Sequence, residues 1–142
     1  MKLHPQLSLV FKGDCEAAFA VYARAFNATI TFMLTWGHSP MAAEAPPGWE
    51  AKIYHASLAI GDTVISGGDV LPDKYETPQG FSVILQMGDS GAADRIFEAL
   101  ADRGTIVMPL QETFWASRFG VVTDRFGIPW SINCEKVAEP AP

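Results

Sequence analysis

The sequence predicts an α+β fold made of two βαβββ units. An alternating, strand-like segment at residues 7–11 passes through Gly13 and Asp14 into a helical stripe of apolar side chains. The same series returns 75 positions later, where a second strand-like segment passes through Gly88 and Asp89 into a second stripe. Each helix is followed by three further segments rich in β-branched and apolar residues. Because both halves repeat the same order, we favour a duplicated unit over two coincidental βα segments of an ordinary α+β domain.

The elements of each unit follow from its periodicity. The apolar stripes are Ala18, Val21, Tyr22, Ala25 and Phe26 in the first helix, and Ala93, Ile96, Phe97, Leu100 and Ala101 in the second. The expected strands are residues 7–11, 28–34, 52–60 and 63–66 in the first unit, and 82–87, 105–110, 115–122 and 130–134 in the second. Before each helix a glycine permits a tight turn, and Asp14 or Asp89 is expected to accept hydrogen bonds from the first free N–H groups.

The chain is expected to form a single domain over residues 1–142. Its parts are unit one at about 4–69, a linker at 70–79, unit two at about 80–135 and a tail at 136–142. A Pro- and Ala-rich segment at residues 38–49 is too long for a simple hairpin turn. Segments of this length tend to be lids, partner contacts or disordered stretches.

Composition limits the kinds of partner. Of the 142 residues, 49% are apolar, and 10 basic against 16 acidic side chains give a formal charge of −6. No Lys/Arg cluster offers the basic face that nucleic acid requires, so we expect no nucleic-acid partner, and the acidic balance favours a cationic guest. No apolar run approaches the roughly 20 residues that cross a bilayer, so we expect no membrane partner and a cytoplasmic location. Cys15 and Cys134 are expected to be reduced core residues rather than a disulfide.

Several strings in the sequence resemble one known superfamily. They are His55-Ala56-Ser57-Leu58, Met-Pro-Leu-Gln-Glu-Thr-Phe-Trp at residues 108–115, Arg118-Phe119-Gly120, Asp124-Arg125-Phe126-Gly127 and Phe-Gly-Ile-Pro-Trp-Ser-Ile-Asn at residues 126–133. Together with the paired units over residues 4–135, they resemble the vicinal oxygen chelate superfamily of glyoxalase, bleomycin-resistance and extradiol dioxygenase proteins, and within it the PhnB-like (demethylubiquinone-methyltransferase-like) branch. The resemblance implies a curved mixed sheet around a cleft, helices on its convex side, and a homodimer. It implies no particular reaction, because activity in this branch is mostly unassigned and a fold does not supply a function.

The metal-dependent members of that superfamily place one ligand on the first and one on the last strand of each unit. In this sequence the four positions are Gln6, Ser66, Ser82 and Asn133. Neutral amides and hydroxyls bind divalent transition metals poorly, because they lack the charge or the imidazole donor that offsets stripping the ion of water. We therefore expect no metal and no other cofactor.

Strand alternation sorts the side chains of the predicted cleft. It directs Leu7, Leu9, Ile65, Val83, Leu85 and Ile132 at the helices, and Gln6, Ser8, Ser66, Ser82, Gln86, Ser131 and Asn133 at the cleft. A polar, uncharged cleft with aromatic walls suits a small organic molecule. The expected ligand-binding residues are Gln6, Ser8, Ser66, Ser82, Gln86, Trp115, Arg118 and Asn133. Phe114 and Trp115 are candidate walls or core residues, and Arg118 meets either an anionic group of the substrate or a carboxylate of the protein.

His55 is the candidate catalytic residue, because it is the one histidine inside an apolar strand and a histidine can act as an acid or a base near neutral pH. A hydrogen-bonded structural role is the alternative. Three classes of function remain open. The first, which we favour, is a metal-free protein that binds an unidentified small molecule. The second is a metal-dependent lyase, isomerase or dioxygenase whose relocated ligands would be His55 together with Glu112 or Asp124. The third is an interaction module that uses residues 38–49.

Overall fold

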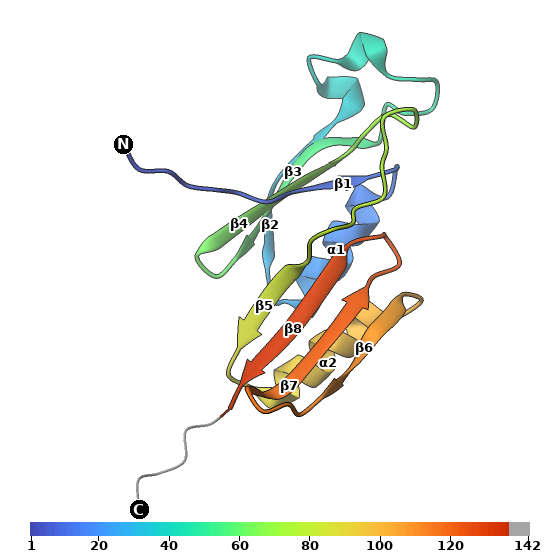
Figure 1. Cartoon of the computed structure of the whole chain (residues 1–142). Coiled ribbons are helices and arrows are strands. Elements are labelled where there is room, and N and C mark those ends of the chain that lie inside the picture. Colours follow the sequence, from blue (N-terminus) through green and yellow to red (C-terminus); the bar gives the residue numbers. More distant parts are fainter. Residues whose placement is uncertain (137–142) are drawn as a thin grey trace, which may run out of the picture. The chain divides into compact units, whose positions relative to one another are not determined.

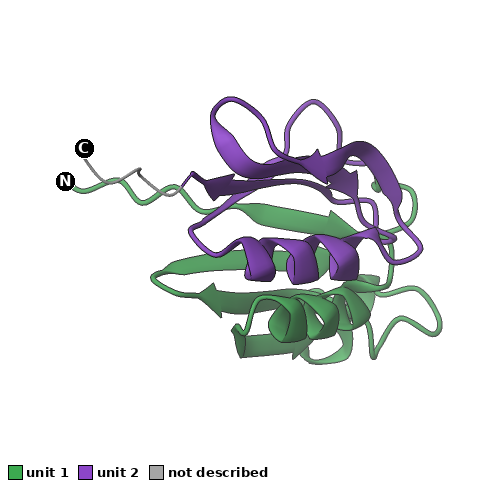
Figure 2. Cartoon of the chain, turned by 90° about the horizontal axis from the view of Figure 1, so that it is seen from below, with its two compact units in different colours: residues 1–76 green, residues 77–142 purple. Residues whose placement is uncertain are grey.

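The structure, a computed structural model, describes residues 1–136, so the tail expected at 136–142 lies almost wholly outside the described residues. The chain divides into two compact units, Met1–Glu76 and a second that starts at Thr77 (Figure 2). Among the described residues, each unit carries one α-helix and one four-stranded mixed sheet (Figure 1). No helix in this part of the chain combines the length and the hydropathy that a membrane span needs.

The first unit is a four-stranded sheet with one helix on one face. Its elements are β1 (Ser8–Phe11), α1 (Cys15–Ala25), β2 (Thr29–Thr35), β3 (Ile53–Ile60) and β4 (Thr63–Asp69). The strands lie in the order β1-β4-β3-β2, with β1 parallel to β4 and the other neighbours antiparallel. Leu9, Phe11 and Phe19 fill the space between sheet and helix and are at most 2% exposed. The rings of Phe11 and Phe19 meet edge to face at 6.1 Å, a favourable aromatic geometry.

The second unit repeats this arrangement. Its elements are β5 (Val83–Met87), α2 (Ser90–Ala101), β6 (Thr105–Gln111), β7 (Ala116–Thr123) and β8 (Pro129–Glu135). The strand order β5-β8-β7-β6, with β5 parallel to β8, matches that of the first unit. Ile132, Trp130 and Leu100 are at most 1% exposed between its sheet and α2. The α+β class and the two βαβββ units are thus confirmed.

The two helices begin differently, although both follow a Gly-Asp pair. Asp89 behaves as predicted: its Oδ1 accepts hydrogen bonds from Gly91 N at 2.9 Å and Ala92 N at 3.3 Å. The prediction for Asp14 was wrong, since its side chain makes no capping hydrogen bond to α1. Asp69, at the end of β4, takes that role through an Oδ1 that accepts from Cys15 N at 2.9 Å. A strand end far away in sequence therefore caps α1.

The repeat is offset by 75 residues in the helices and by 76 in the first strands. The buried Ala18 of α1 corresponds to the buried Ala93 of α2. In the strands, the helix-facing Leu9 corresponds to Leu85, which pairs with the fully buried Ile132. The turn before α1 spans residues 12–14, one residue longer than the turn before α2. This extra residue keeps each strand's apolar face inward, because a shift of one position would turn every side chain to the opposite face.

β4 continues three residues beyond its predicted end at Ser66, because two glycines there fit close contacts. A Cβ at Gly67 would lie 2.9 Å from the ring of Phe19 in α1, and a Cβ at Gly68 would meet the backbone carbonyl of Tyr54. Glycine is a poor strand former unless another group approaches closely, and this is the case at both positions. The prolonged strand carries Asp69 to the helix start.

The segment between β2 and β3 is anchored by Trp36. It contains two 3-10 turns, η1 (Trp36–His38) and η2 (Ala42–Glu44). The indole Nε1 of Trp36 donates to the carbonyl of Asp69 at 2.9 Å, and its ring meets those of Trp49 and Tyr54 edge to face at 5.9 and 5.1 Å. Trp36 just before residues 38–49 thus packs against Trp49 at the end of that segment, and this contact brings the two sides of the segment together.

Candidate functional site

The face of the first sheet opposite α1, its outer face, carries a row of serines. Ser8 of β1 pairs with Ser66 of β4, which in turn pairs with Ser57 of β3, and paired residues on neighbouring strands point to the same side. Gly67 and its partner Leu9 point the other way, towards α1. The sheet thus presents three hydroxyl groups side by side, with Ser8 exposed and Ser66 only 8% exposed.

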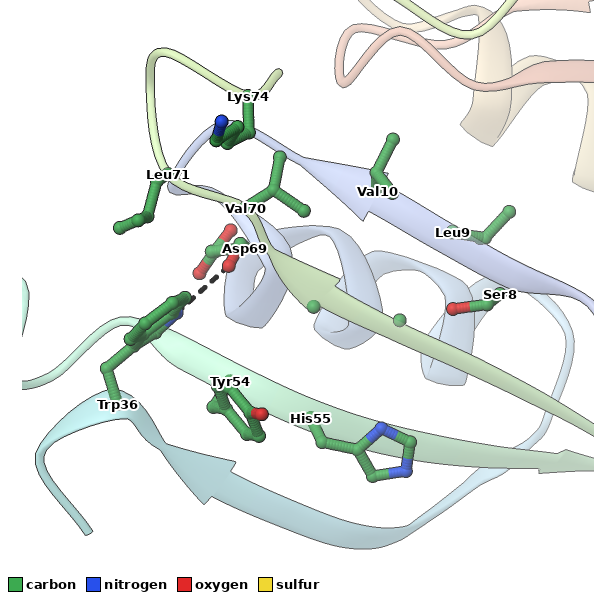
Figure 3. A pocket seen from close by; sticks show the side chains of 12 residues that line it. Ser8, Leu9, Val10, Trp36, Tyr54, His55, Asp69, Val70, Leu71 and Lys74 are labelled. Carbon is green, nitrogen blue, oxygen red and sulfur yellow. Dashed lines mark hydrogen bonds between the residues drawn. The ribbon is translucent and has the colours of Figure 1, made fainter. Parts of the chain in front are cut away.

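A β-bulge at Tyr54 changes which side chains of β3 reach this face. Leu34 of β2 pairs with His55, but the next residue, Thr35, pairs with Ile53, so Tyr54 is the extra residue. A bulge interrupts strict alternation and re-aims a side chain. Figure 3 shows Tyr54 and His55, although adjacent in sequence, on the same side of the sheet.

These elements enclose a pocket of about 490 Å³ in the first unit (Figure 3). Its lining residues are Ser8, Leu9, Val10, Trp36, Tyr54, His55, Gly67, Gly68, Asp69, Val70, Leu71 and Lys74. The aromatic side chains of Trp36 and Tyr54 lie on one side of the hollow, and the aliphatic side chains of β1 and of residues 70–71 lie on the other. The size and the mixture of apolar walls with a few polar groups are those of a small-molecule site.

The carboxylate of Asp69 lies at this pocket but is committed to the fold. Its Oδ1 accepts hydrogen bonds from Gly13 N and Cys15 N, and its Oδ2 accepts one from Ile53 N, each at 2.9 Å. With the residue only 2% exposed, the carboxylate has no freedom to turn towards a ligand. The other ionisable lining groups are His55, Tyr54 and Lys74, so the pocket offers a ligand no free carboxylate.

His55, the candidate catalytic residue, lies on the rim of this pocket and is exposed. Its ring lies 5.7 Å from that of Phe32 on the neighbouring strand. Within residues 1–136, no side chain hydrogen-bonds to its imidazole to fix its orientation, as one normally does for a general acid or base. A catalytic role for His55 therefore stays a prediction.

On the outer face of the second sheet, three predicted site residues form one hydrogen-bonded chain. Trp115 Nε1 donates to Asn133 Oδ1 at 3.2 Å, and Asn133 Nδ2 donates to Gln86 Oε1 at 2.7 Å. Gln86 and Asn133 face each other in the parallel pairing of β5 and β8. Nearby on the same face, the hydroxyls of Ser82 and Ser131 lie 2.8 Å apart.

An aromatic cluster adjoins this chain. The ring of Trp115 meets those of Phe114 and Phe119 at 4.8 and 5.2 Å, with interplanar angles of 79° and 66°. The backbone hydrogen bond from Thr113 N to the carbonyl of Ala116, 3.0 Å long, folds the preceding segment into the turn that presents these rings. Phe114 is 89% exposed and Trp115 47% exposed, so both are surface residues and the alternative of core packing is wrong for them.

Two predicted site residues lie apart from these groups. Arg118 is paired with α2 of its own unit: its Nε lies 3.2 Å from Asp94 Oδ1, and its NH1 donates to the carbonyl of Ser117. This is the carboxylate-paired alternative for Arg118. Gln6 is exposed in the segment before β1 and does not line the pocket.

The donor groups do not fit a transition metal. The four positions that the sequence resemblance assigns to metal ligands, Gln6 and Ser66 in the first unit and Ser82 and Asn133 in the second, carry only neutral side chains. Within residues 1–136, no three His, Cys, Asp or Glu side chains come together as a possible metal site. Of the alternative ligands, Asp124 is buried and already accepts hydrogen bonds, among them one from Trp130 Nε1 at 2.8 Å.

The sequence analysis did not identify four residues at the pocket or on the outer face of the first sheet: Trp36, Tyr54, Ser57 and Lys74. Ser57 could have been found, because it alternates with His55 along β3. Tyr54 had no such signal, since alternation alone directs it towards the helix and only the bulge brings it to the pocket. Lys74 lies in the predicted linker, and Trp36 enters from the segment after β2.

Known proteins are similar to this chain in sequence and in fold. The chain matches the Glyoxalase/Bleomycin resistance protein/Dioxygenase superfamily over residues 4–132. Protein YjdN of Escherichia coli strain K12 is 37% identical over an alignment of 144 positions, which covers 96% of this chain and 97% of that protein. The crystal structure of protein PA1353 from Pseudomonas aeruginosa has a TM-score of 0.86 and 39% identity, and covers 96% of this chain and 100% of its own.

A PhnB protein from Bacillus cereus shares the fold at a TM-score of 0.79 with 22% identity, over 93% of this chain and 99% of its own. The superfamily match spans both βαβββ units, and the relatives above match nearly the whole chain. This chain therefore belongs to the Glyoxalase/Bleomycin resistance protein/Dioxygenase superfamily.

Proposed function

We propose that this protein binds a small organic molecule without the help of a metal ion. The observation that carries the proposal is the pocket of about 490 Å³ on the outer face of the first unit, with aromatic side chains on one side and hydroxyl groups beside it. Tyr54, packed against the buried Trp36, supplies apolar area that a ligand would cover, and Ser8 and His55 supply polar groups that would orient it.

The charge of the pocket favours a neutral or anionic guest. The net charge of −6 had suggested a cation, but that argument concerns the average field of the chain. At the pocket the carboxylate of Asp69 is held by three backbone N–H groups, while Lys74 and His55 bring positive or neutral character. Short-range groups decide which ligand is bound, because salt screens the field of distant surface charges.

A thermal-shift screen of neutral, anionic and cationic aromatic compounds tests this proposal. A ligand that binds only the folded protein raises its apparent stability by RT ln(1 + [L]/Kd). We expect hits among the neutral and anionic compounds, with shifts that EDTA leaves unchanged. Ser8→Phe, which fills the pocket from β1, should abolish the shift. Thr31→Phe, an equal change at an exposed residue of β2 outside the pocket, should retain it.

Two results would overturn the proposal. One is the absence of any shift at millimolar ligand. The other is binding that EDTA abolishes and a divalent metal restores, together with about one metal ion per chain by elemental analysis. The second result would favour the metal-dependent lyase, isomerase or dioxygenase, for which the donor groups of the described residues give no support.

A further inference from the structure

The hydrogen-bonded chain of Trp115, Asn133 and Gln86 has only one possible direction. The indole N–H of Trp115 can donate but not accept, so the side-chain oxygen of Asn133 must face it. The NH2 group of Asn133 must then face Gln86, and this fixes the oxygen of Gln86 as the acceptor. One donor-only side chain therefore sets the orientation of two amides that could otherwise flip.

This direction leaves the N–H groups of Gln86 at the end of the hydrogen-bonded series of side chains. Among residues 1–136, Gln86 Nε2 makes no hydrogen bond to a protein acceptor, and because Gln86 is exposed both protons are open to a ligand. Gln86 is exposed, and at the other end of the chain lie the rings of Trp115 and Phe114, 47% and 89% exposed. The surface thus combines an aromatic platform with outward amide donors, while the side-chain oxygens of Asn133 and Gln86 each already accept one hydrogen bond within the chain of side chains.

We propose that the outer face of the second unit binds an aromatic molecule that carries a hydrogen-bond acceptor, a carboxylate or a carbonyl oxygen. The ring would stack on Trp115, and the acceptor would receive the N–H groups of Gln86. The inference rests on the proposed function only in taking the protein to be a small-molecule binder, since its residues are separate from the pocket of the first unit.

The first test is an NMR titration of the full-length, 15N-labelled chain. The side-chain amide signals of Gln86 and Asn133 and the indole signal of Trp115 are assigned by their absence in Gln86→Glu, Asn133→Asp and Trp115→Phe. Benzoate and acetophenone serve as acceptor probes, and benzylamine, which brings only donors, is the matched probe. We expect both acceptor probes to shift all three signals, with apparent Kd values at least tenfold below that of benzylamine, because unpaired donors cannot bind another donor.

The second test reverses the direction of the hydrogen bonds that link Trp115, Asn133 and Gln86. In Asn133→Asp the carboxylate can only accept, so it takes the indole N–H and turns the NH2 of Gln86 inward, which leaves the oxygen of Gln86 facing the ligand. Acetophenone should bind at least tenfold more weakly and benzylamine more tightly. Gln111→Glu, which adds the same charge opposite Phe119 on the same sheet, should leave acetophenone binding unchanged. Gln86→Glu, at an exposed position, also turns an oxygen outward and gives the same reversal if the variant at Asn133 does not fold.

The possible outcomes separate this inference from the proposed function. If probes shift the Trp36 indole signal but leave Gln86 and Asn133 unmoved, the first pocket binds ligands and the inference fails. Equal binding of benzylamine and benzoate also overturns it. An equal loss of acetophenone affinity in Asn133→Asp and Gln111→Glu would overturn it too, because the added charge alone would then explain the effect. If no signal in the second unit moves with any probe, the inference fails, whereas the proposed function is decided by the thermal-shift screen.

Discussion

Gly68 shows how one residue without a side chain shapes the pocket. A Cβ there would meet the carbonyl of Tyr54, a backbone group that cannot move aside without disturbing the bulge. We expect Gly68→Ala to lower the free energy of unfolding by about 1–3 kcal/mol, the usual cost of overpacking, measured by urea denaturation. Gly88→Ala is the matched control, because nothing lies within 4 Å of its added methyl group. Equal stability of the two variants would contradict this account of the bulge.

The buried thiol of Cys15 makes the stability of the chain depend on alkaline pH. Burial, and to a lesser extent the nearby carboxylates of Asp69, Asp14 and Glu16, raises the pKa of Cys15 well above its ordinary value. In the unfolded chain a thiol ionises near pH 8.5, whereas in the folded protein this one stays protonated. Above about pH 8.5 the unfolded state therefore holds fewer protons, and the free energy of unfolding falls by about 1.4 kcal/mol per pH unit from this group.

Urea denaturation between pH 7 and 10 measures this fall. The curve of Cys15→Ala should be flatter than that of the wild type above pH 8.5, although its absolute stability at pH 7 is lower because the thiol is fully buried. Below pH 8 the two curves should run parallel. Parallel curves over the whole range would show that Cys15 ionises as easily in the folded protein as in the unfolded chain.

At this scale, the sequence predicted the kinds of group and not their partners. It placed Gln86, Asn133 and Trp115 in one site, and the structure joins them in one chain of hydrogen bonds. It left Arg118 between two roles, because the carboxylate of Asp94 lies 24 residues away on α2 and only tertiary packing brings it to 3.2 Å. Local patterns identify a donor or acceptor, whereas pairing depends on the whole sheet.

Among the elements, α2 owes its start to Asp89. The two N–H groups that its carboxylate satisfies have no partner within the helix. We expect Asp89→Ala to cost about 1 kcal/mol of unfolding free energy in urea denaturation. Ser90→Ala, one residue further on at an exposed position, should change it by less than about 0.5 kcal/mol. A cost shared equally by both variants would mean that the cap contributes nothing specific.

Period-two alternation predicted the buried faces of the strands because most of each strand is regular. Leu9, Ile65 and Ile132 are buried as expected, at 2%, 5% and 0% exposure. The irregular places escaped prediction. Tyr54 is the extra residue of a bulge, and the two glycines at the end of β4 lengthen a strand that the sequence ended early. Both departures lie at the pocket, where close backbone approach replaces ordinary side-chain packing.

For the whole molecule, duplication is the feature that the sequence carries most strongly. Two βαβββ units were predicted from a repeat of about half the chain, and their sheets have the same strand order. Divergence between the halves then explains why the outer faces differ. The outer face of the first unit has serines beside a pocket, and that of the second unit has amide side chains beside exposed aromatic rings. The named groups on both outer faces are hydroxyls and N–H donors, and none of them is a free carboxylate. The chemistry of these faces therefore differs from the net negative charge of the whole chain.

The edge strand β6 leads to the last prediction, which concerns the assembly of the chain. Ile106, Val107 and Met108 are consecutive apolar residues with exposures of 51%, 59% and 40%, next to a register shift in the pairing with β7. An exposed apolar edge is an aggregation hazard unless another chain covers it. We therefore expect a homodimer that covers this edge, with a light-scattering mass of twice the 15.4 kDa of one chain.

Charge at this edge should weaken such a dimer. Val107→Lys places an ammonium group among apolar side chains, and burying it unpaired in an interface is costly, so the mass at micromolar concentration should fall towards 15.4 kDa. Thr105→Lys, an exposed polar position on the same strand, should leave the dimer intact. If the wild type already has the mass of one chain, the dimer does not form. If Val107→Lys remains dimeric, the chains associate through another surface. The edge of β6 then stays exposed in the dimer, with the register shift as the feature that disrupts its pairing with further strands.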